Sequence, residues 1–286
     1  MQLKDAFTNA VRRLDGEGVG SPRMNGEMLL MFVLGCDRAH LYAHSERELT
    51  ADEQSRYEDA VGLRASGYPA QYITGHQEFW GLDLIVSPDV LIPRPETEHV
   101  VETALELVRA DAGRYAEAGP KLVDVGTGSG AIALALATEL PAAEIYAIEL
   151  SPEALEVAKA NAARLQLDGH VRFLVSDVMD SVPRDGSFDL VLSNPPYVGF
   201  HEADKVQDVV KKFEPRMAVF AGECGLDVIR RLIPQAYDAL RPGGYLIFEI
   251  GYTMAPAATE LLAGWMDVHA VADLAGIPRV MVARRP

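Results

Sequence analysis

Residues 121–137 read KLVDVGTGSGAIALALA. The apolar start predicts a buried strand over 121–125, and the small residues after the glycines predict a helix. The glycines between them permit a tight turn and close approach of the backbone to a ligand: Gly126, Gly128 and Gly130. The loop also fits the dinucleotide fingerprint literally, because Ala131 can take its last place. The stretch therefore predicts a nucleoside cofactor, without separating NAD from the others.

Acidic residues stand at the ends of three successive predicted strands. Asp124 lies beside the glycine loop. A carboxylate there would repel a pyrophosphate but suit the cationic sulfonium and ammonium of S-adenosylmethionine. The alternative is that Asp124 only caps the turn. Glu149 closes the strand 144–150 and can accept hydrogen bonds from both ribose hydroxyls. Asp177 ends the run 171–177 and is a candidate to receive the adenine amino group, or else a loop carboxylate.

The motif Asn194-Pro195-Pro196-Tyr197 follows the apolar run FDLVLS at 188–193, which predicts a buried strand. To methylate a planar NH2 group, an enzyme must hold both N–H groups and leave the nitrogen facing the methyl donor. The Asn194 side-chain oxygen can accept one N–H and the Pro195 carbonyl the other. Pro195 and Pro196 stiffen the loop, and Tyr197 can cover the flat face of the substrate group. The alternative is an ordinary proline turn.

From residue 121 onward, predicted strands and helices alternate, which implies a mostly parallel sheet covered on both faces. The last two apolar runs, 268–276 and 279–285, are joined by too few residues for a parallel crossover and so predict an antiparallel hairpin. This α/β pattern, five parallel strands with a closing hairpin, matches the architecture of class I methyltransferases. The parallel strands are predicted at 121–125, 144–150, 171–176, 188–193 and 245–250.

The first 75 residues have a different pattern. Apolar residues recur at helical spacing in 3–14 and 26–34, and Thr50 with Glu53 forms a capping box ahead of a further helix. Residues 79–92 predict two short strands joined by Ser87-Pro88-Asp89. We therefore expect an N-terminal helical domain over 1–75, a β-hairpin linker over 76–95 and a catalytic domain over 96–286.

Composition restricts the possible partners. The formal net charge of −16 is a poor electrostatic footprint for gripping phosphate backbones, so we expect no stable nucleic-acid binding. Cys36 and Cys224 are the only cysteines and imply no disulfide framework. The seven histidines show no ligand spacing, which predicts no metal. The N-terminus lacks a signal-peptide core and no apolar run is long enough to cross a bilayer, so a cytoplasmic protein without membrane contact is expected.

The chain resembles the HemK-like family of release-factor glutamine N5-methyltransferases over nearly its whole length. The most specific stretch is YPAQYITGHQEFWGLDLIVSPDVLIPRPETE at 68–98, and the glycine loop and the NPPY motif follow at the expected places. AGECGLDVIRRLI at 221–233 resembles a further family segment, with Glu223-Cys224 where an acidic residue is usual. The family's DAE is Asn25-Gly26-Glu27 here, and a glycine at that place would weaken a helix.

This resemblance implies an S-adenosylmethionine-dependent enzyme whose substrate is the glutamine of the GGQ motif in class I peptide chain release factors. The products would be N5-methylglutamine and S-adenosylhomocysteine. The resemblance places Val178 against the adenine, where many relatives have a large aromatic residue. It implies that the cofactor is held by Gly126, Thr127, Gly128, Ser129, Gly130 and Glu149, and the glutamine by Asn194, Pro195, Pro196 and Tyr197.

Three alternatives remain open at this level. A ribosomal-protein glutamine methyltransferase would share the fold and the NPPY loop and differ in the N-terminal docking domain. An adenine N6-methyltransferase acting on DNA or RNA would meet the same donor geometry, but it needs a flipped base and is disfavoured by the charge of −16. A non-enzymatic adaptor could keep the fold as a scaffold, which the presence of Asp124, Glu149 and Asn194 argues against.

Overall fold

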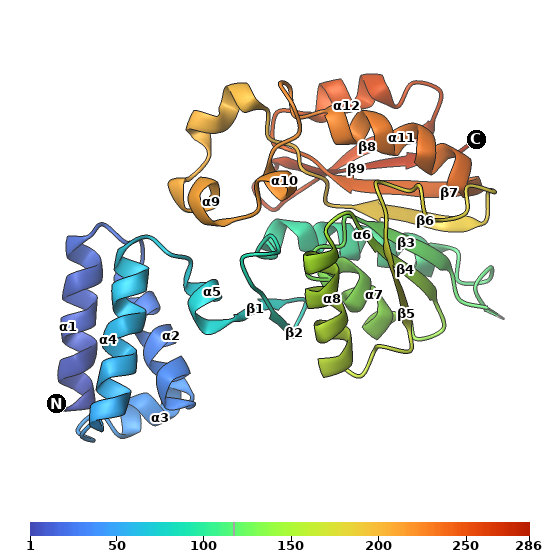
Figure 1. The fold of residues 1–286 in the computed structure, drawn as a ribbon. Helices are drawn as coiled ribbons and strands as arrows, with labels where there is room; N and C mark the ends of the chain where they lie inside the picture. Colours follow the sequence, from blue (N-terminus) through green and yellow to red (C-terminus); the bar gives the residue numbers. More distant parts are fainter. Residues whose placement is uncertain (117) are drawn as a thin grey trace. The chain divides into compact units, whose positions relative to one another are not determined.

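The computed structural model describes residues 1–116 and 118–286 (Figure 1). The chain divides into two compact units. Unit 1 comprises Met1–His76 together with Asp208–Phe213, and unit 2 comprises Gln77–Gln207 together with Glu214–Pro286. Each unit has its own buried core.

Unit 2 is built on a seven-stranded sheet with the order β5-β4-β3-β6-β7-β9-β8. The first five strands in this order are parallel, and they are β5 (Val171–Val175), β4 (Glu144–Glu149), β3 (Lys121–Val125), β6 (Phe188–Ser193) and β7 (Leu240–Glu249). β9 (Pro278–Arg284) pairs antiparallel with both β7 and β8 (Met266–Ala272). The predicted parallel sheet and its closing hairpin are therefore confirmed.

Helices cover both faces of this sheet, because successive strand residues point to opposite sides. Leu122, Ile145 and Leu190 pack on one face, with the core of α6 (Glu98–Ala110), α7 (Ala131–Glu139) and α8 (Pro152–Arg164). Val123, Ile148 and Val191 pack on the other, with α11 (Asp227–Ala239) and α12 (Ala255–Leu261). Figure 1 shows these two helical layers on either side of the sheet. Shorter elements of unit 2 are η1 (Pro95–Thr97), η2 (Phe200–Lys205) and α10 (Arg216–Val219).

The hairpin predicted at 79–92 lies earlier in the chain. Its strands are β1 (His76–Phe79) and β2 (Leu82–Ile85), and Trp80 and Gly81 form the turn, with φ of 54° and 73°. Two consecutive residues with positive φ give the twist that a two-residue hairpin needs. The prediction that Ser87-Pro88-Asp89 joins the strands is wrong, because turn residues favour a bend without fixing which bend pairs two strands.

Unit 1 is helical. Its elements are α1 (Leu3–Gly16), α2 (Pro22–Leu34), α3 (Arg38–Ala43), α4 (Ala51–Ala65) and α5 (Ala70–Thr74), with α9 (Asp208–Phe213) from the later part of the chain. The capping box of Thr50 and Glu53 is present at the start of α4. The Phe213 ring packs edge-on against Tyr68, with 5.1 Å between ring centroids.

Gly26 has a packing role that accounts for a glycine inside α2. A Cβ atom on Gly26 would lie 3.3 Å from the Phe7 ring of α1, which is tighter than most carbon contacts. The Tyr57 hydroxyl of α4 donates a hydrogen bond to the Gly26 carbonyl at 3.0 Å. A glycine at this position lowers the helix propensity of α2, but it allows α1, α2 and α4 to pack closely.

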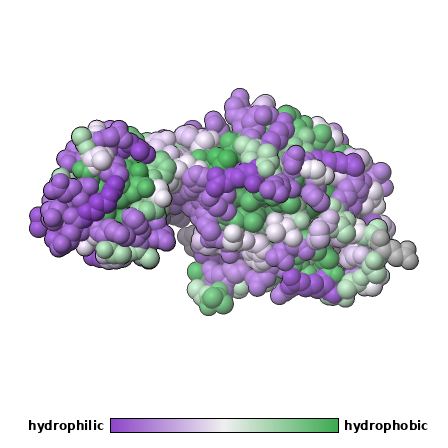
Figure 2. All heavy atoms as spheres, turned by 90° about the horizontal axis from the view of Figure 1, so that it is seen from below, coloured by the Kyte–Doolittle hydropathy of each residue, from purple (hydrophilic) through white to green (hydrophobic). Residues whose placement is uncertain are grey.

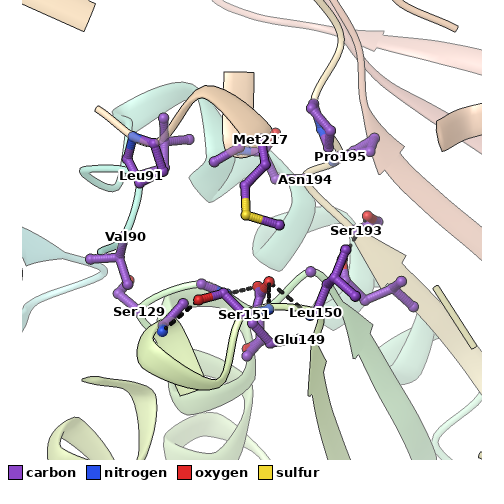
Figure 3. Close-up of a pocket in the computed structure, with 18 of the residues that line it drawn as sticks. Val90, Leu91, Ser129, Glu149, Leu150, Ser151, Ser193, Asn194, Pro195 and Met217 are labelled. Atoms are coloured by element: carbon purple, nitrogen blue, oxygen red, sulfur yellow. Dashed lines mark hydrogen bonds between the residues drawn. The ribbon is translucent and has the colours of Figure 1, made fainter. Parts of the chain in front are cut away.

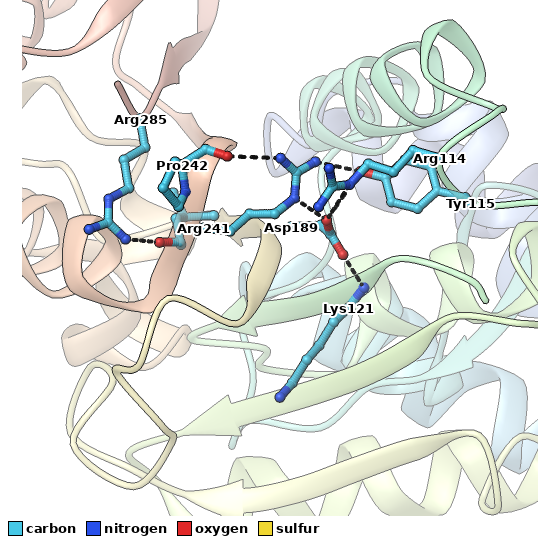
Figure 4. A network of polar contacts seen from close by, with 8 residues as sticks. Arg114, Tyr115, Lys121, Asp189, Arg241, Pro242 and Arg285 are labelled. Atoms are coloured by element: carbon cyan, nitrogen blue, oxygen red, sulfur yellow. Dashed lines mark hydrogen bonds and ion pairs between the residues drawn. The ribbon is translucent and has the colours of Figure 1, made fainter. Parts of the chain in front are cut away.

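Polar side chains hold the amino ends of three strands together (Figure 4). Asp189 of β6 accepts hydrogen bonds from the backbone N–H of Lys121 in β3 at 2.9 Å and from Arg241 Nε in β7 at 2.5 Å. Arg114 Nε and the Tyr115 hydroxyl both lie 3.4 Å from the same carboxylate. This network lies at the amino ends of the strands, and the predicted site residues lie at the opposite, carboxyl ends.

Hydrophilic residues cover most of the face seen in Figure 2, with smaller hydrophobic patches between them. None of the helices in the described ranges has the length and hydrophobicity needed to cross a membrane.

Asn161 of α8 joins three segments of unit 2 and is fully buried. Its oxygen accepts from the Ile85 N–H at 2.6 Å, and its nitrogen donates to the Ile85 and Ser129 carbonyls at 2.9 Å each. One side chain thus fixes the end of β2 and the glycine loop to α8.

We expect Asn161→Ala to lower the free energy of unfolding of unit 2 by about 2 kcal/mol, because one buried backbone group of Ser129 and two part-buried groups of Ile85 lose their partner. Urea denaturation followed by tryptophan fluorescence measures this, since Trp80 and Trp265 both belong to unit 2. Lys159→Ala, an exposed position on the same helix, is the control. Equal stability of the two variants would contradict the assigned role.

Candidate functional site

A pocket lies at the carboxyl edge of the parallel strands (Figure 3). Most of the residues predicted from the sequence line it, and these are Gly126, Thr127, Gly128, Ser129, Glu149, Asp177, Val178, Asn194, Pro195 and Pro196. Asp124, Gly130 and Tyr197 lie outside the lining of this pocket. The topology therefore brings the loops after β3, β4, β5 and β6 to one cavity.

The three glycines of the loop are required for different structural reasons. All have positive φ, at 73°, 55° and 85° for Gly126, Gly128 and Gly130. A Cβ on Gly126 or Gly128 would meet no protein atom within 4 Å, whereas one on Gly130 would lie 3.0 Å from Leu134 and 3.3 Å from Ala158. Gly130 therefore permits close packing of α7 and α8, while the other two leave room beside the pocket.

Asp124 lies beneath the glycine loop and is 1% exposed. Its Oδ2 atom accepts hydrogen bonds from the Thr127 hydroxyl at 2.6 Å and from the Ala133 N–H at 3.2 Å. Its Oδ1 atom is buried without a hydrogen-bond partner among the described residues. Burial raises the pKa of Asp124 to about 7, and the charge of Glu149 adds to this rise. Its contact with a cofactor stays a prediction.

Glu149 braces the pocket through three backbone hydrogen bonds (Figure 3). Its Oε1 accepts from the N–H groups of Leu150 at 2.8 Å and Ser151 at 3.1 Å, and its Oε2 accepts from Gly128 at 2.9 Å. A carboxylate offers about four lone-pair positions. Oε2 therefore keeps one position for a ligand hydroxyl, and the contact of Glu149 with both ribose hydroxyls stays a prediction.

Asp177 and Val178 occupy the next loop. Asp177 forms an ion pair with Arg231 of α11 at 2.7 Å, and both side chains line the pocket. Val178 has a φ of 51°, a left-handed conformation that is rare for a β-branched residue. Such strain costs on the order of 1–3 kcal/mol and is typical of functional sites. Sequence reasoning missed Arg231, which lies within the family segment at 221–233.

The NPPY motif is held by a buried polar cluster. Asn194 Nδ2 donates to Thr97 Oγ1 at 2.9 Å, and Thr97 Oγ1 donates to Glu249 Oε2 at 2.5 Å. The Tyr197 hydroxyl donates to Glu249 Oε1 at 3.0 Å, so this ring packs behind the loop. Burial raises the pKa of Glu249 to about 7. Burial also raises the pKa of the Tyr197 hydroxyl well above its usual value.

Sequence reasoning missed Thr97 and Glu249. Glu249 had a signal, because it is the last residue of β7 as Glu149 is the last residue of β4. Thr97 stands within the quoted stretch at 68–98, but its partners lie 97 and 152 residues away in the chain. Only the folded structure brings them together.

A segment after α9 completes the pocket. Met217 points into the cavity between Asn194 and the Glu149 side (Figure 3), and Pro215 and Ala218 also line it. Glu214 anchors this segment, because it forms an ion pair with Arg94 and accepts from the Ile92 N–H at 3.2 Å. The loop before η1 and the segment after α9 are thus fixed to each other at the pocket.

A glycine loop, an acidic residue at the second strand and an Asn-Pro-Pro-Tyr loop around one pocket, on this mixed sheet, define a class I methyltransferase. Comparison with known proteins agrees. A family model described as the PrmC N-terminal domain matches residues 5–75, and one described as a methyltransferase domain matches residues 116–273.

The chain belongs to the release factor glutamine methyltransferase family. It is 53% identical to the release factor glutamine methyltransferase of Koribacter versatilis over 100% of this chain and 99% of that one. It is 42% identical to that of Moorella thermoacetica, again over 100% and 99% of the two chains.

Solved structures share the fold at lower identity. A methyltransferase from Pyrococcus furiosus matches 72% of this chain and 89% of its own, with a TM-score of 0.51 and 20% identity. The catalytic domain of hMettl16, solved in complex with an RNA hairpin, matches 81% of each chain, with a TM-score of 0.56 and 17% identity.

We expect Asp124→Asn to change how stability depends on pH. The folded protein holds the Asp124 proton more tightly than the unfolded chain, so this group's contribution is complete below about pH 4 and is lost as pH rises through about 7. The asparagine of the variant does not ionise, so the variant loses no stability from this group as pH rises. Its unfolding free energy should therefore rise relative to that of wild type between about pH 5 and pH 8. Urea denaturation of the ligand-free protein tests this.

The exposed Asp168→Asn is the control for loss of one carboxylate. A constant difference between Asp124→Asn and wild type across this pH range would mean that Asp124 is ionised as readily in the folded protein as in the unfolded one.

Proposed function

We propose that this protein uses S-adenosylmethionine to methylate the side-chain amide nitrogen of the glutamine in the GGQ motif of class I peptide chain release factors. The observation that carries the proposal is the position of Asn194 and Pro195, which line the same pocket as the glycine loop and Glu149. Membership in the release factor glutamine methyltransferase family supports the choice of substrate.

The pocket residues fit the proposed cofactor. Open space beside Gly126 and Gly128, where a Cβ would meet no protein atom within 4 Å, suits a ligand that packs against the backbone. The remaining lone-pair position of Glu149 Oε2 suits a ribose hydroxyl. Asp124 lies beneath the loop, outside the pocket lining, and its carboxylate in the ionised form favours a cationic ligand. When bound, S-adenosylmethionine supplies a methyl group activated by a positively charged sulfur.

The protein's own task is to hold the amide. An amide nitrogen is a poor nucleophile, because its lone pair is delocalised into the carbonyl. Asn194 Oδ1 and the Pro195 carbonyl oxygen accept the two N–H groups and so turn the nitrogen toward the methyl group. These two oxygens also stabilise the positive charge that develops on the nitrogen as the N–C bond forms and the S–C bond breaks. The nitrogen loses one proton during or after the transfer, to water or to the surroundings of the loop carbonyls.

Substrates of other classes fit less well. The charge of −16 disfavours a nucleic acid held by its phosphates. A ribosomal-protein glutamine would fit the same pocket. A release factor is preferred because the relatives carry that name and because the model of the PrmC N-terminal domain matches residues 5–75.

We expect Asn194→Ala to retain cofactor binding and to lose roughly 10²–10³ in turnover, by analogy with removal of one oxyanion-hole donor. Labelled S-adenosylmethionine offered to an intact release factor measures turnover, and calorimetry measures cofactor binding. A release factor with Gln→Ala in its GGQ motif is the control for the methylated position. Turnover within a few-fold of wild type would remove Asn194 from the site.

We further propose that the helical domain of residues 1–75 docks the body of the release factor. The pocket recognises only an amide group, so the choice of one glutamine among many requires a second surface. Docking raises the effective concentration of the GGQ loop at the pocket, and glycines beside the glutamine let that loop enter without side-chain clashes. The exposed apolar side chains Met24, Phe32 and Leu63 are available for such contacts.

A chain beginning at Gln77 should methylate an isolated GGQ peptide as well as the full-length enzyme does. It should lose the preference for the intact release factor, because that preference comes from docking. Equal activity on the peptide shows that the shortened protein is folded, so the comparison is internally controlled. If the shortened protein kept the full preference, the docking surface would have to lie within residues 77–286.

A further inference from the structure

We infer that Thr97 and Glu249 are positioning residues that set the orientation of the Asn194 amide, so that its oxygen and not its nitrogen faces the substrate. The inference rests on the proposed function, because it concerns how the site accepts an NH2 group. Thr97 is among the residues that line the pocket and Glu249 lies outside its lining, and the inference gives both a role that acts through Asn194.

The cluster is shielded from water. Thr97 is 4% exposed and Glu249 is 2% exposed. In such surroundings a hydrogen bond lost inside the protein is not replaced by one to solvent, so the donors and acceptors must match. The strand register explains why they meet: Ser193 of β6 pairs with Phe248 of β7, so Asn194 and Glu249 emerge side by side at the edge of the sheet.

The direction of each hydrogen bond follows from the number of protons available. An ionised Glu249 can only accept, so both of its contacts require donors. The Thr97 hydroxyl has one proton, which goes to Glu249 Oε2. Its oxygen must therefore accept from Asn194, and only the Nδ2 end of that amide can donate. Asn194 Oδ1 is left for the pocket.

The reversed Asn194 amide would meet a conflict. Its oxygen would face the Thr97 oxygen with no proton between them, because that proton is already committed to Glu249. Its NH2 group would face the pocket and oppose the NH2 group of a glutamine substrate. Glu249 thus acts on the substrate through the Thr97 hydroxyl and the Asn194 amide. The direction of these hydrogen bonds gives the site its selectivity for an amide NH2.

The charge of Glu249 is set by groups on several elements. Burial raises its pKa to about 7, while hydrogen bonds from Thr97 and Tyr197 and the charge of Arg279 oppose the rise, and Glu96 adds to it. Above pH 7 the accepting carboxylate prevails. Comparisons among variants are therefore made at about pH 8, where the carboxylate is mostly ionised.

Glu249→Gln is the decisive variant, because it keeps the shape and the number of hydrogen bonds but reverses one of them. The oxygen of the introduced amide accepts from Tyr197 and its NH2 group donates to Thr97, which frees the Thr97 proton to point at Asn194 and favours the wrong amide orientation. We expect kcat to fall roughly 10–100-fold, the range for outer-shell partners of metal ligands. KM for the release factor and the dissociation constant for S-adenosylmethionine should not rise, and the resistance to urea should not fall.

Two changes at Thr97 complete the test. Thr97→Val keeps the volume and removes the hydroxyl, so it should show a loss of kcat like that of Glu249→Gln. Thr97→Ser keeps the hydroxyl and should stay within a few-fold of wild type. A wild-type kcat for Glu249→Gln or Thr97→Val would overturn the inference, and so would a loss of activity that only parallels a loss of folding. Failure of the proposed function is distinct, because the wild-type enzyme itself would then not methylate the release factor.

Discussion

The parallel pairing of β3 with β6 is the constraint on which the site depends. To one side of this pair the sheet continues through β4 and β5, and to the other through β7. The strand order therefore reverses between β3 and β6, and loops that leave such a point diverge and open a crevice. Val125 pairs with Ser193. The glycine loop and the NPPY loop begin at the next residue of each strand, so both reach the same pocket.

Buried carboxylates recur around this pocket and serve as fixed acceptors. Asp124 orders the turn into α7, and Glu249 orders the NPPY loop through Thr97 and Tyr197. Each costs stability, because burial raises its pKa to about 7. The Asp189 cluster at the other end of the strands is different, since Arg241 and Arg114 neutralise that carboxylate. Asp124 and Glu249 at the functional end of the sheet are thus held by hydrogen bonds, whereas Asp189 at the other end is held by arginine side chains.

The sequence predicted the architecture well where local signals and burial agree. β3 and β6 begin and end at the predicted residues, because each is a short apolar run bounded by turn residues. The antiparallel end of the sheet followed from the length of one connection. The β1–β2 hairpin was misplaced, because the decisive turn contains Trp80, a residue that seldom adopts positive φ.

The site was predicted less completely than the fold. Asn194 and Glu149 stand in recognisable motifs, so the sequence alone could nominate them, and the structure places both at one pocket. Thr97, Asn161 and Glu249 carry no motif, and their roles come from partners distant in the chain. Gly26 shows the same limit for packing, since only its distance to Phe7 explains why a glycine suits that helix.

The orientation of Asn194 has a consequence for damaged substrates. A glutamine that has deamidated to glutamate presents two oxygens, and both would face the accepting oxygens of Asn194 and Pro195. Repulsion between these like-charged atoms, away from bulk water, would keep such a loop out of the pocket. Under the proposed function, the hydrogen-bond order that selects an NH2 group would also reject a chemically damaged loop, so that a release factor with a deamidated glutamine would leave unmethylated.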